Sequence, residues 1–488
     1  MITLSFGRVE GLPEEEQGQL NDLVFVYNYH QAANGKKRKY YEGKISLMDV
    51  NLGIALPSSI SKLEIGCAWG AKTVDVLAAR SMFDGFVTEN GTESPEMTAI
   101  MQRNHLIAEY NKAVKEELKY GCAFAAVSGK EGDARVRFYS PNCAAAIWNA
   151  KDGRIKCGFA FEDNRKDESD VTWTPDNVNL YTDTDIWELE KQGGGWIAIR
   201  HPHTFNEPLM VALVWDATND KPLGQSRLKG AIRKLIQGYV RTVANATIGL
   251  EFATSPQKYL LGVSDEQYDT LVDSRFQQYV GSILFSTNNP ETGDKPTFGQ
   301  LNQGNIEPHV QMLRMLATQF SAATGLTVTD TGVVNDANPT SSEAIIAQSQ
   351  TLILLAEQLN TSNGDALYRI GRMALAIEFG TTPDELPDGS DGIIAHFKNP
   401  AMPSVAVTSD AAIKIASARP AFANTDTFLE MIGFDQADIR RIKAQELKAQ
   451  GDAILTDEFS NVEEEAPEET TGEDTEEDVD ADISGGME

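Results

Sequence analysis

The sequence is poor in cysteine and histidine. It has only four cysteines and six histidines among 488 residues, and no two cysteines form a Cys-x-x-Cys pair. This composition argues against a structural zinc site, a dithiol redox motif and a disulfide framework. We expect Cys67, Cys122, Cys143 and Cys157 to be reduced core thiols of a cytosolic protein. We predict no bound metal and no cofactor.

Long apolar runs are also missing. No window of 18 or more consecutive apolar residues occurs, so we expect no membrane-spanning helix and no membrane partner. The first residues lack a basic segment followed by an apolar one, which argues against a secretory signal peptide.

Complete catalytic motifs are absent as well. The stretch Gly66–Thr73 resembles a phosphate-binding loop only superficially, because its glycines are too close and Ala71 separates the second glycine from Lys72. His201 and His203 flank a proline, and no third metal ligand follows at a suitable spacing. We therefore predict no catalytic residues and a protein that is not an enzyme.

Basic residues disappear after Lys448. The chain has 42 Lys and Arg against 72 Asp and Glu, a formal net charge of −30. Fifteen acidic residues lie between Asp457 and Glu488, so this tail accounts for half of the excess. We expect residues 457–488 to be a disordered acidic tail. Such a tail either keeps the chain soluble or repels polyanions.

The first half of the chain indicates helices followed by a β-rich unit. Helical patterns occupy residues 1–60, Val74–Arg80 and Ser94–Tyr120, with Gly121 as a stop signal. Residues 121–220 contain short apolar or alternating runs between turn residues, which predicts an antiparallel β-rich unit. The expected strands are Ala123–Val127, Arg135–Tyr139, Ala144–Trp148, Cys157–Phe161, Asn179–Tyr181 and Trp196–Arg200.

Two amphipathic helices then flank an insert. The first, Ser226–Phe252, has apolar residues at spacings of three and four: Leu228, Ala231, Ile232, Leu235, Tyr239, Val243 and Ile248. Its other face carries Lys229, Arg233 and Arg241. The second helix is Pro308–Ala323, and the insert between them should hold a helix, Ser264–Val280, and a strand, Ile283–Phe285. The cationic face suits an ordinary solvated helix or a helix packed in a ring around an anion.

A very long helix follows. Thr340 and Glu343 form a capping-box pattern, and the periodic pattern runs to about Phe379. We expect Gly364 and Gly371 to bend this helix without ending it. The last predicted helices are Ser409–Ala418, Asp426–Gly433 and Gln436–Gln450.

The order of these elements resembles the portal proteins of long-tailed (siphovirus-type) double-stranded DNA bacteriophages. The resemblance spans roughly residues 20–450. It is carried by Tyr40–Lys44, Trp69 before Val74–Arg80, Arg135–Pro141, Gly224–Leu228, Ser255–Gly262, Pro308–Val310 and Pro339–Ile345. The segment Gly325–Thr329 departs from the family, where an Ile-Pro and a Leu-Gly pair often follow the second helix.

The resemblance implies a mixed α+β fold of portal type that assembles into a ring, typically of twelve subunits. The implied parts are a β-containing wing (1–223), stem helix one (224–254), a small α/β clip (255–306), stem helix two (307–324), a tunnel loop (325–338), a long helix with its return to the wing (339–403), a helical crown (404–456) and the acidic tail (457–488).

The resemblance also implies a function. The ring would occupy one capsid vertex, where double-stranded DNA passes without sequence specificity during packaging and ejection. The implied partners are the terminase large subunit, the major capsid protein, the scaffold protein and a head-completion or adaptor protein. The protein would reside in the virion, and in the host cytoplasm during assembly.

Candidate DNA-facing residues come from the loop and the first stem helix. The loop Gly325–Asn338 is polar and small, so its side chains would grip a phosphate backbone weakly. We expect Thr329, Thr331, Val333, Asn335 and Asn338 to line the channel, although the loop also fits a plain helix connector. The stem cations Lys229, Arg233 and Arg241 would either lie near DNA or meet neighbouring subunits and solvent.

Two other classes of protein remain open at this stage. One is a cytosolic enzyme, with or without a metal requirement, whose site is built from carboxylates of the β-rich unit. Such an enzyme would be a monomer or dimer stabilised by a divalent metal. The other is a different virion component, such as a scaffold or connector adaptor, although the helix–insert–helix order argues against it.

Overall fold

The computed structural model describes residues 3–46, 64–88, 94–165, 173–254, 258–261, 293, 295, 297–300, 305–332, 342–387, 390, 392–401, 405–434 and 436–463. It divides into two compact units, Met1–Ala401 and Met402–Glu488. Within the described residues, no helix is both long enough and apolar enough to cross a bilayer.

Among its described residues the first unit contains five antiparallel sheets, two of which have more than two strands, and this mixture with helices confirms the predicted mixed α+β class. The larger has the order β10-β9-β8-β7-β6 and the smaller β11-β4-β5. Their strands are β4 (Cys122–Lys130), β5 (Asp133–Tyr139), β6 (Ala144–Asn149), β7 (Arg154–Phe161), β8 (Asn177–Tyr181), β9 (Asp185–Gln192), β10 (Gly195–Pro202) and β11 (Met210–Val214). All six expected strands are present, and β9 and β11 are additional.

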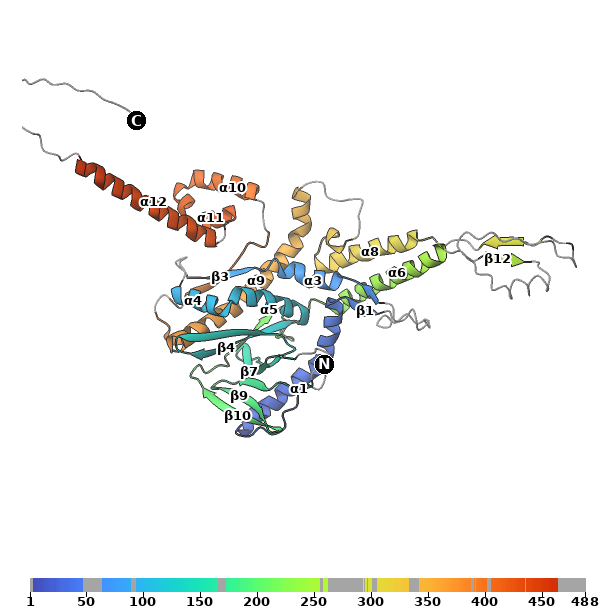
Figure 1. Ribbon diagram of the computed structural model, residues 1–488, viewed down its shortest axis with the longest axis horizontal. Coiled ribbons are helices and arrows are strands. Elements are labelled where there is room, and N and C mark those ends of the chain that lie inside the picture. The colour runs from blue at the N-terminus through green and yellow to red at the C-terminus, as the bar shows by residue number, and fades with distance from the viewer. Residues whose placement is uncertain are drawn as a thin grey trace, which may run out of the picture. The chain divides into compact units, whose positions relative to one another are not determined.

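Helix α1 (Glu14–Tyr41) covers the five-stranded sheet (Figure 1). Its Leu20, Leu23 and Tyr27 are buried in one apolar cluster with Phe159 and Phe161 of β7. The hydroxyl of Tyr27 donates to the carbonyl oxygen of Asn142 at 2.7 Å. Burying these large side chains is the main force that attaches the helix to the sheet.

The smaller sheet is covered by α5 (Leu106–Tyr120) and α9 (Ser342–Phe379). The single helix predicted over Ser94–Tyr120 is wrong, because His105 adopts the left-handed conformation (φ 50°) and separates α4 (Pro95–Asn104) from α5. The predicted stop at Gly121 is confirmed, since this residue caps α5 with φ 114°.

The long helix α9 runs unbroken through Gly364 and Gly371, so neither glycine ends it, as expected. Gly371 is a close-packing position, since a Cβ there would lie 2.6 Å from Cδ1 of Ile393. Ile393 begins β14 (Ile393–Phe397), which pairs with β3 (Phe83–Thr88). The capping box at Thr340 lies outside the described residues.

Helices α6 (Gly230–Thr254) and α8 (Glu307–Thr324) run side by side and confirm both predicted amphipathic helices (Figure 1). Two short antiparallel strands, β12 (Lys258–Leu261) and β13 (Thr297–Gln300), follow α6 and precede α8. The expected helix Ser264–Val280 and strand Ile283–Phe285 fall outside the described residues.

Helix α3 (Trp69–Ala78) follows a small strand pair of β1 (Lys44–Ser46) and β2 (Glu64–Gly66). Within the stretch Gly66–Thr73, Gly70 allows α3 to pack closely against the end of α1. A Cβ at Gly70 would collide with the carbonyl oxygen of Tyr40, so α3 crosses the end of α1 where only glycine fits. This contact explains the second glycine of the superficial phosphate-loop motif.

The second unit consists of helices α10 (Val405–Ala418), α11 (Asp426–Ile432) and α12 (Gln436–Glu463). They confirm the three predicted C-terminal helices. Because α12 continues to Glu463, the predicted start of a disordered tail at residue 457 is wrong. Residues 464–488 lie outside the described part of the chain.

Candidate functional site

The candidate site lies where the start of α6, the end of α8, helix α3 and the segment 325–332 meet. The helix pair is held by an apolar stripe that begins at Leu228, just before α6, and continues along the helix through Ile232, Ile236, Val240 and Ala244. From α8, the same core contains Leu316, Ala317 and Phe320. The stripe repeats every four residues. It differs from the predicted stripe, because two members of that prediction are not buried: Ala231 is exposed and Tyr239 is only half-buried.

A buried arginine ties three segments together. Arg227 is 6% exposed. Its Nε donates to the carbonyl oxygen of Thr73 at 2.6 Å, and Nη2 donates to that of Thr324 at 2.5 Å. The guanidinium also lies 5.7 Å from the ring of Trp215. Burial lowers the pKa of Arg227 to about 10, so the side chain remains a cation at neutral pH.

This arginine meets the C-terminal end of α8, because Thr324 is the last residue of that helix. Carbonyl groups at a helix C-terminus lack intrahelical donors and carry partial negative charge. A guanidinium therefore suits this position, and it fixes the start of α6 relative to the end of α8. This role was not predicted, because the partners of Arg227 lie on segments that are distant in the sequence.

A tryptophan anchors the segment that follows α8. The indole nitrogen of Trp69 donates to the carbonyl oxygen of Thr331 at 3.0 Å, and the contact is buried. The ring lies 4.5 Å from Phe320 of α8 and 4.6 Å from Tyr239 of α6, measured between centroids. Trp69 therefore contacts both helices and the loop that joins α8 to α9.

The first half of the predicted polar loop is an ordered turn. Gly325 caps α8 in the left-handed conformation (φ 73°), and a 3-10 helix spans Thr329–Thr331. The carboxylate of Asp330 accepts from the backbone nitrogen and hydroxyl of Thr327 at 2.9 and 2.8 Å. These local bonds hold the turn in one conformation.

The predicted channel-lining residues have different environments. Thr329 is exposed, whereas Thr331 is only 8% exposed and its hydroxyl donates to the carbonyl oxygen of Val328. The Thr331 side chain is thus buried within the single chain, and the backbone carbonyl of this residue is bound by Trp69. That Thr329 and Thr331 line a channel stays a prediction. Val333, Asn335 and Asn338 lie outside the described residues.

The three predicted stem cations do not share one environment. Lys229 precedes α6 and pairs with Asp216 at 2.7 Å. Arg233 is half-buried over the ring of Tyr40, with 5.9 Å from guanidinium to centroid. Arg241 is exposed and makes no ion pair with any residue that the structure describes. Of the three, Arg241 is the one left to solvent or to a partner.

A second buried polar cluster connects α5 to α9. Glu117 is fully buried, and its Oε2 accepts from Asn363 Nδ2 at 2.8 Å. Asn363 also donates to the hydroxyl of Tyr110, which lies 2.8 Å from that of Ser81. Burial raises the pKa of Glu117 to about 8, so its carboxyl is largely protonated at neutral pH.

The two histidines set aside in the sequence have separate environments in the structure. His201 lies on β10 and pairs with Glu188 of β9 at 3.3 Å, while His203 follows that strand. In the described ranges, no group of three or more His, Cys, Asp or Glu side chains is arranged to hold a metal ion.

Comparison with known proteins identifies the family. The family model described as "Phage portal protein, SPP1 Gp6-like" matches residues 33–452. No curated protein sequence matches the chain.

The chain is also similar to a chain of "Virion of native gene transfer agent (GTA) particle", at 13% identity and a TM-score of 0.44, with 75% of this chain and 89% of that one covered. A chain of "Neck of empty GTA particle computed with C6 symmetry" has 12% identity and a TM-score of 0.44, with 78% and 90% covered. Because the family match extends over most of the sequence, from α1 to α12, the chain belongs to the SPP1 Gp6-like phage portal protein family.

Proposed function

We propose that this protein forms the portal ring at one vertex of a phage-type capsid, the opening through which double-stranded DNA is packaged and ejected. The family match over residues 33–452 is the observation that carries this proposal. We expect about twelve subunits in the ring. The long-tailed, siphovirus-type assignment stays a prediction.

The paired helices supply the parts that a channel requires. In our proposal α6 and α8 form the stem, residues 255–306 the clip, and residues 404–456 the crown. Residues 1–223, with the return of the chain after α9, form the wing. The buried contacts of Arg227 and Trp69 support this division, because they fix the stem and the following loop to one body.

A channel for DNA must guide a polyanion without holding it. Each cation that neutralises a phosphate adds salt-dependent affinity, so a densely basic lining would slow movement. The exposed hydroxyl of Thr329 is neutral and short, and Lys229 is already neutralised by Asp216. In this proposal Thr329 contacts the passing DNA, whereas exposed Arg241 is available for a neighbouring subunit or for DNA.

The proposal includes partners but no chemistry by this chain. The terminase large subunit would hydrolyse ATP while docked on the ring, and the major capsid, scaffold and head-completion proteins would contact its outside. The protein would be part of the virion and would pass through the host cytoplasm during assembly. We propose no catalytic residue, no cofactor and no membrane contact.

Electron microscopy of the purified full chain tests the proposal. We expect rings with a central hole and high rotational symmetry, most often twelvefold, and no ATP turnover by these rings. A chain that stays a monomer or dimer alone and within assembled particles would overturn the proposal. A divalent metal that stabilises such a monomer would favour the rival, a carboxylate-based enzyme.

A further inference from the structure

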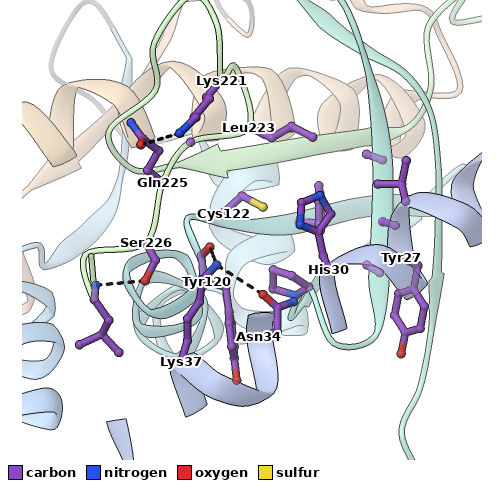
Figure 2. A pocket seen from close by; sticks show the side chains of 18 of the residues that line it. Tyr27, His30, Asn34, Lys37, Tyr120, Cys122, Lys221, Leu223, Gln225 and Ser226 are labelled. Atoms are coloured by element: carbon purple, nitrogen blue, oxygen red, sulfur yellow. Dashed lines mark hydrogen bonds between the residues drawn. The ribbon is translucent and has the colours of Figure 1, made fainter. Parts of the chain in front are cut away.

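A pocket of about 670 Å³ lies beside the start of α6 and is unexplained by the portal function. It is bounded by one side of α1, the first residues of β4, the alanines of β6 and the segment 221–230 (Figure 2). Its volume is within the range of pockets that bind small molecules.

The residues that line this pocket carry net positive charge, whereas the chain as a whole carries net negative charge. Four cationic side chains line it, Lys37, Lys221, Lys229 and Arg233, and no Asp or Glu is among its lining residues. The whole chain has 72 acidic against 42 basic residues. A concave surface lined by one sign of charge concentrates ions of the other sign.

Two of these cations, Lys37 and Arg233, line the same pocket and have no acidic partner among the described residues. The ammonium of Lys37 donates to the carbonyl oxygen of Tyr120 at 2.8 Å and lies 3.4 Å from Oδ1 of Asn34 (Figure 2). The guanidinium of Arg233 lies over the aromatic ring of Tyr40. Neither cation forms an ion pair in the described part of the chain. The pKa of Lys37 is lowered, chiefly by burial and further by the charge of Arg233.

Keeping a half-buried ammonium in the same pocket as a guanidinium costs free energy, and a bound anion would lower this cost. Taking charges out of water costs free energy, and like charges at close range add to this cost. An anion placed between the two groups would accept charge-assisted hydrogen bonds from both.

The rest of the pocket combines apolar side chains with polar ones such as His30, Asn34 and Gln225. Ala144, Ala145, Ala146 and Phe124 supply an apolar surface from the sheets. The opposite wall is pinned by Ser226, whose hydroxyl donates to the carbonyl oxygen of Lys119 at 2.6 Å. A ligand for this site therefore has an anionic head and an apolar body.

We propose that this pocket binds a small organic anion, with a phosphate or carboxylate head between Lys37 and Arg233 and an apolar body against the alanines of β6. Lys221, at the segment that leads into α6, extends the positive field around the opening, whereas Lys229 is paired with Asp216. The proposal is independent of ring formation, because all of the groups named belong to one chain.

Phenyl phosphate is a suitable probe, with inorganic phosphate and benzyl alcohol as its charged and apolar halves. We expect phenyl phosphate to bind the full-length protein in isothermal titration calorimetry and to raise its melting temperature. Each half alone should bind at least about tenfold more weakly, since each forgoes either the charge-assisted bonds or the apolar contact.

Arg233→Met is the decisive variant, because it removes a cation that makes no ion pair within the described residues and keeps an apolar stem over Tyr40. We expect at least about a tenfold loss of affinity. Lys234→Met and Lys36→Met, which remove exposed neighbouring cations, should bind as the wild type does. Circular dichroism and the ligand-free melting temperature establish that the variants are folded.

Three results would overturn the proposal. They are no binding by the wild type at millimolar phenyl phosphate, equal binding by Arg233→Met, and equal loss of binding in Lys234→Met or Lys36→Met. If rings form normally while any of these results is obtained, the portal function stands and the anion site is rejected.

Discussion

The indole nitrogen of Trp69 lies 3.0 Å from the carbonyl oxygen of Thr331, a residue 262 positions further along the chain. This single hydrogen bond joins α3 to the turn that follows α8. Both partners are buried, so the carbonyl oxygen of Thr331 has no water to replace the indole if it is removed. The position of the turn therefore depends on a residue outside it.

Trp69→Phe should keep the aromatic packing and lose the hydrogen bond. We expect a loss of about 1–3 kcal/mol in the free energy of unfolding, because the carbonyl oxygen of Thr331 is left buried without a donor. Amide hydrogen exchange of residues 327–332 should accelerate selectively. Equal exchange of this turn in Trp69→Phe and the wild type would show that the indole does not hold it.

Arg227→Met should destabilise the junction of α3, α6 and α8. The substitution keeps an apolar stem of similar length but leaves the carbonyl oxygens of Thr73 and Thr324 without their donor. We expect a loss on the order of 2–4 kcal/mol in unfolding free energy, measured with the unassembled chain in urea. Arg241→Met, an exposed change on the same helix, should stay within about 0.5 kcal/mol of the wild type.

Glu117 should make stability depend on pH. Because its pKa is raised to about 8 in the folded chain, folding retains a proton that the unfolded chain releases near its ordinary pKa of 4.5. The contribution is thus fully present below about pH 4.5 and is lost progressively as pH rises toward 8.

Glu117→Gln should remove this dependence, since an amide of the same shape does not ionise in this range. The variant should gain stability relative to the wild type as pH increases, by an amount on the order of a few kcal/mol at pH 8. Urea titrations at several pH values measure the difference. A stability difference between the two proteins that does not change with pH would contradict the assignment.

Gly70→Ala should be poorly tolerated. The new methyl group would meet the backbone carbonyl of Tyr40, and relief requires α3 to move away from α1. We expect a loss of about 1–3 kcal/mol or failure to fold. Gly249→Ala in α6, where a Cβ meets nothing within 4 Å, should instead gain up to about 1 kcal/mol through helix propensity. Thermal unfolding of both variants checks the contrast.

Thr329→Lys tests the proposed channel. If Thr329 faces the passage, a ring of such subunits places a circle of cations around DNA, and binding should strengthen and become more salt-dependent. Titration of a labelled duplex against purified rings at several salt concentrations measures both. Thr329→Ser should match the wild type, and a Lys variant with unchanged salt dependence would place this residue outside the channel.

Much of the fold was predictable from local pattern, and the exceptions have physical causes. The strand Asp185–Gln192 was missed although Trp187 and Leu189 alternate with Glu188 and Glu190 as in a strand, because it begins at a buried aspartate, Asp185. That aspartate is compensated by Arg200 at 2.6 Å, a contact made across the sheet. The pairing of β9 with β10 brings Arg200 to that residue, and the hydroxyl of Thr184 donates a further hydrogen bond to its carboxylate at 2.8 Å.

The candidate site was harder to predict, because its decisive contacts join distant segments. The periodicity of α6 indicated an apolar stripe but placed it on Ala231 and Tyr239, since several residues of α6 are apolar on adjoining faces. Ile236 and Val240 are buried instead because α8 packs against that side. The composition of the loop likewise could not reveal that Trp69 would bury Thr331.

The pairing of β12 with β13 has a consequence for engineering. Leu261 stands opposite Thr297, so the chain leaves and rejoins this strand pair at adjacent points. We therefore expect the spacing between the ends of α6 and α8 not to depend on the residues between Leu261 and Thr297. A foreign peptide or reporter grafted between these two positions needs only closely spaced ends, and the scaffold beneath it should accept inserts of differing length.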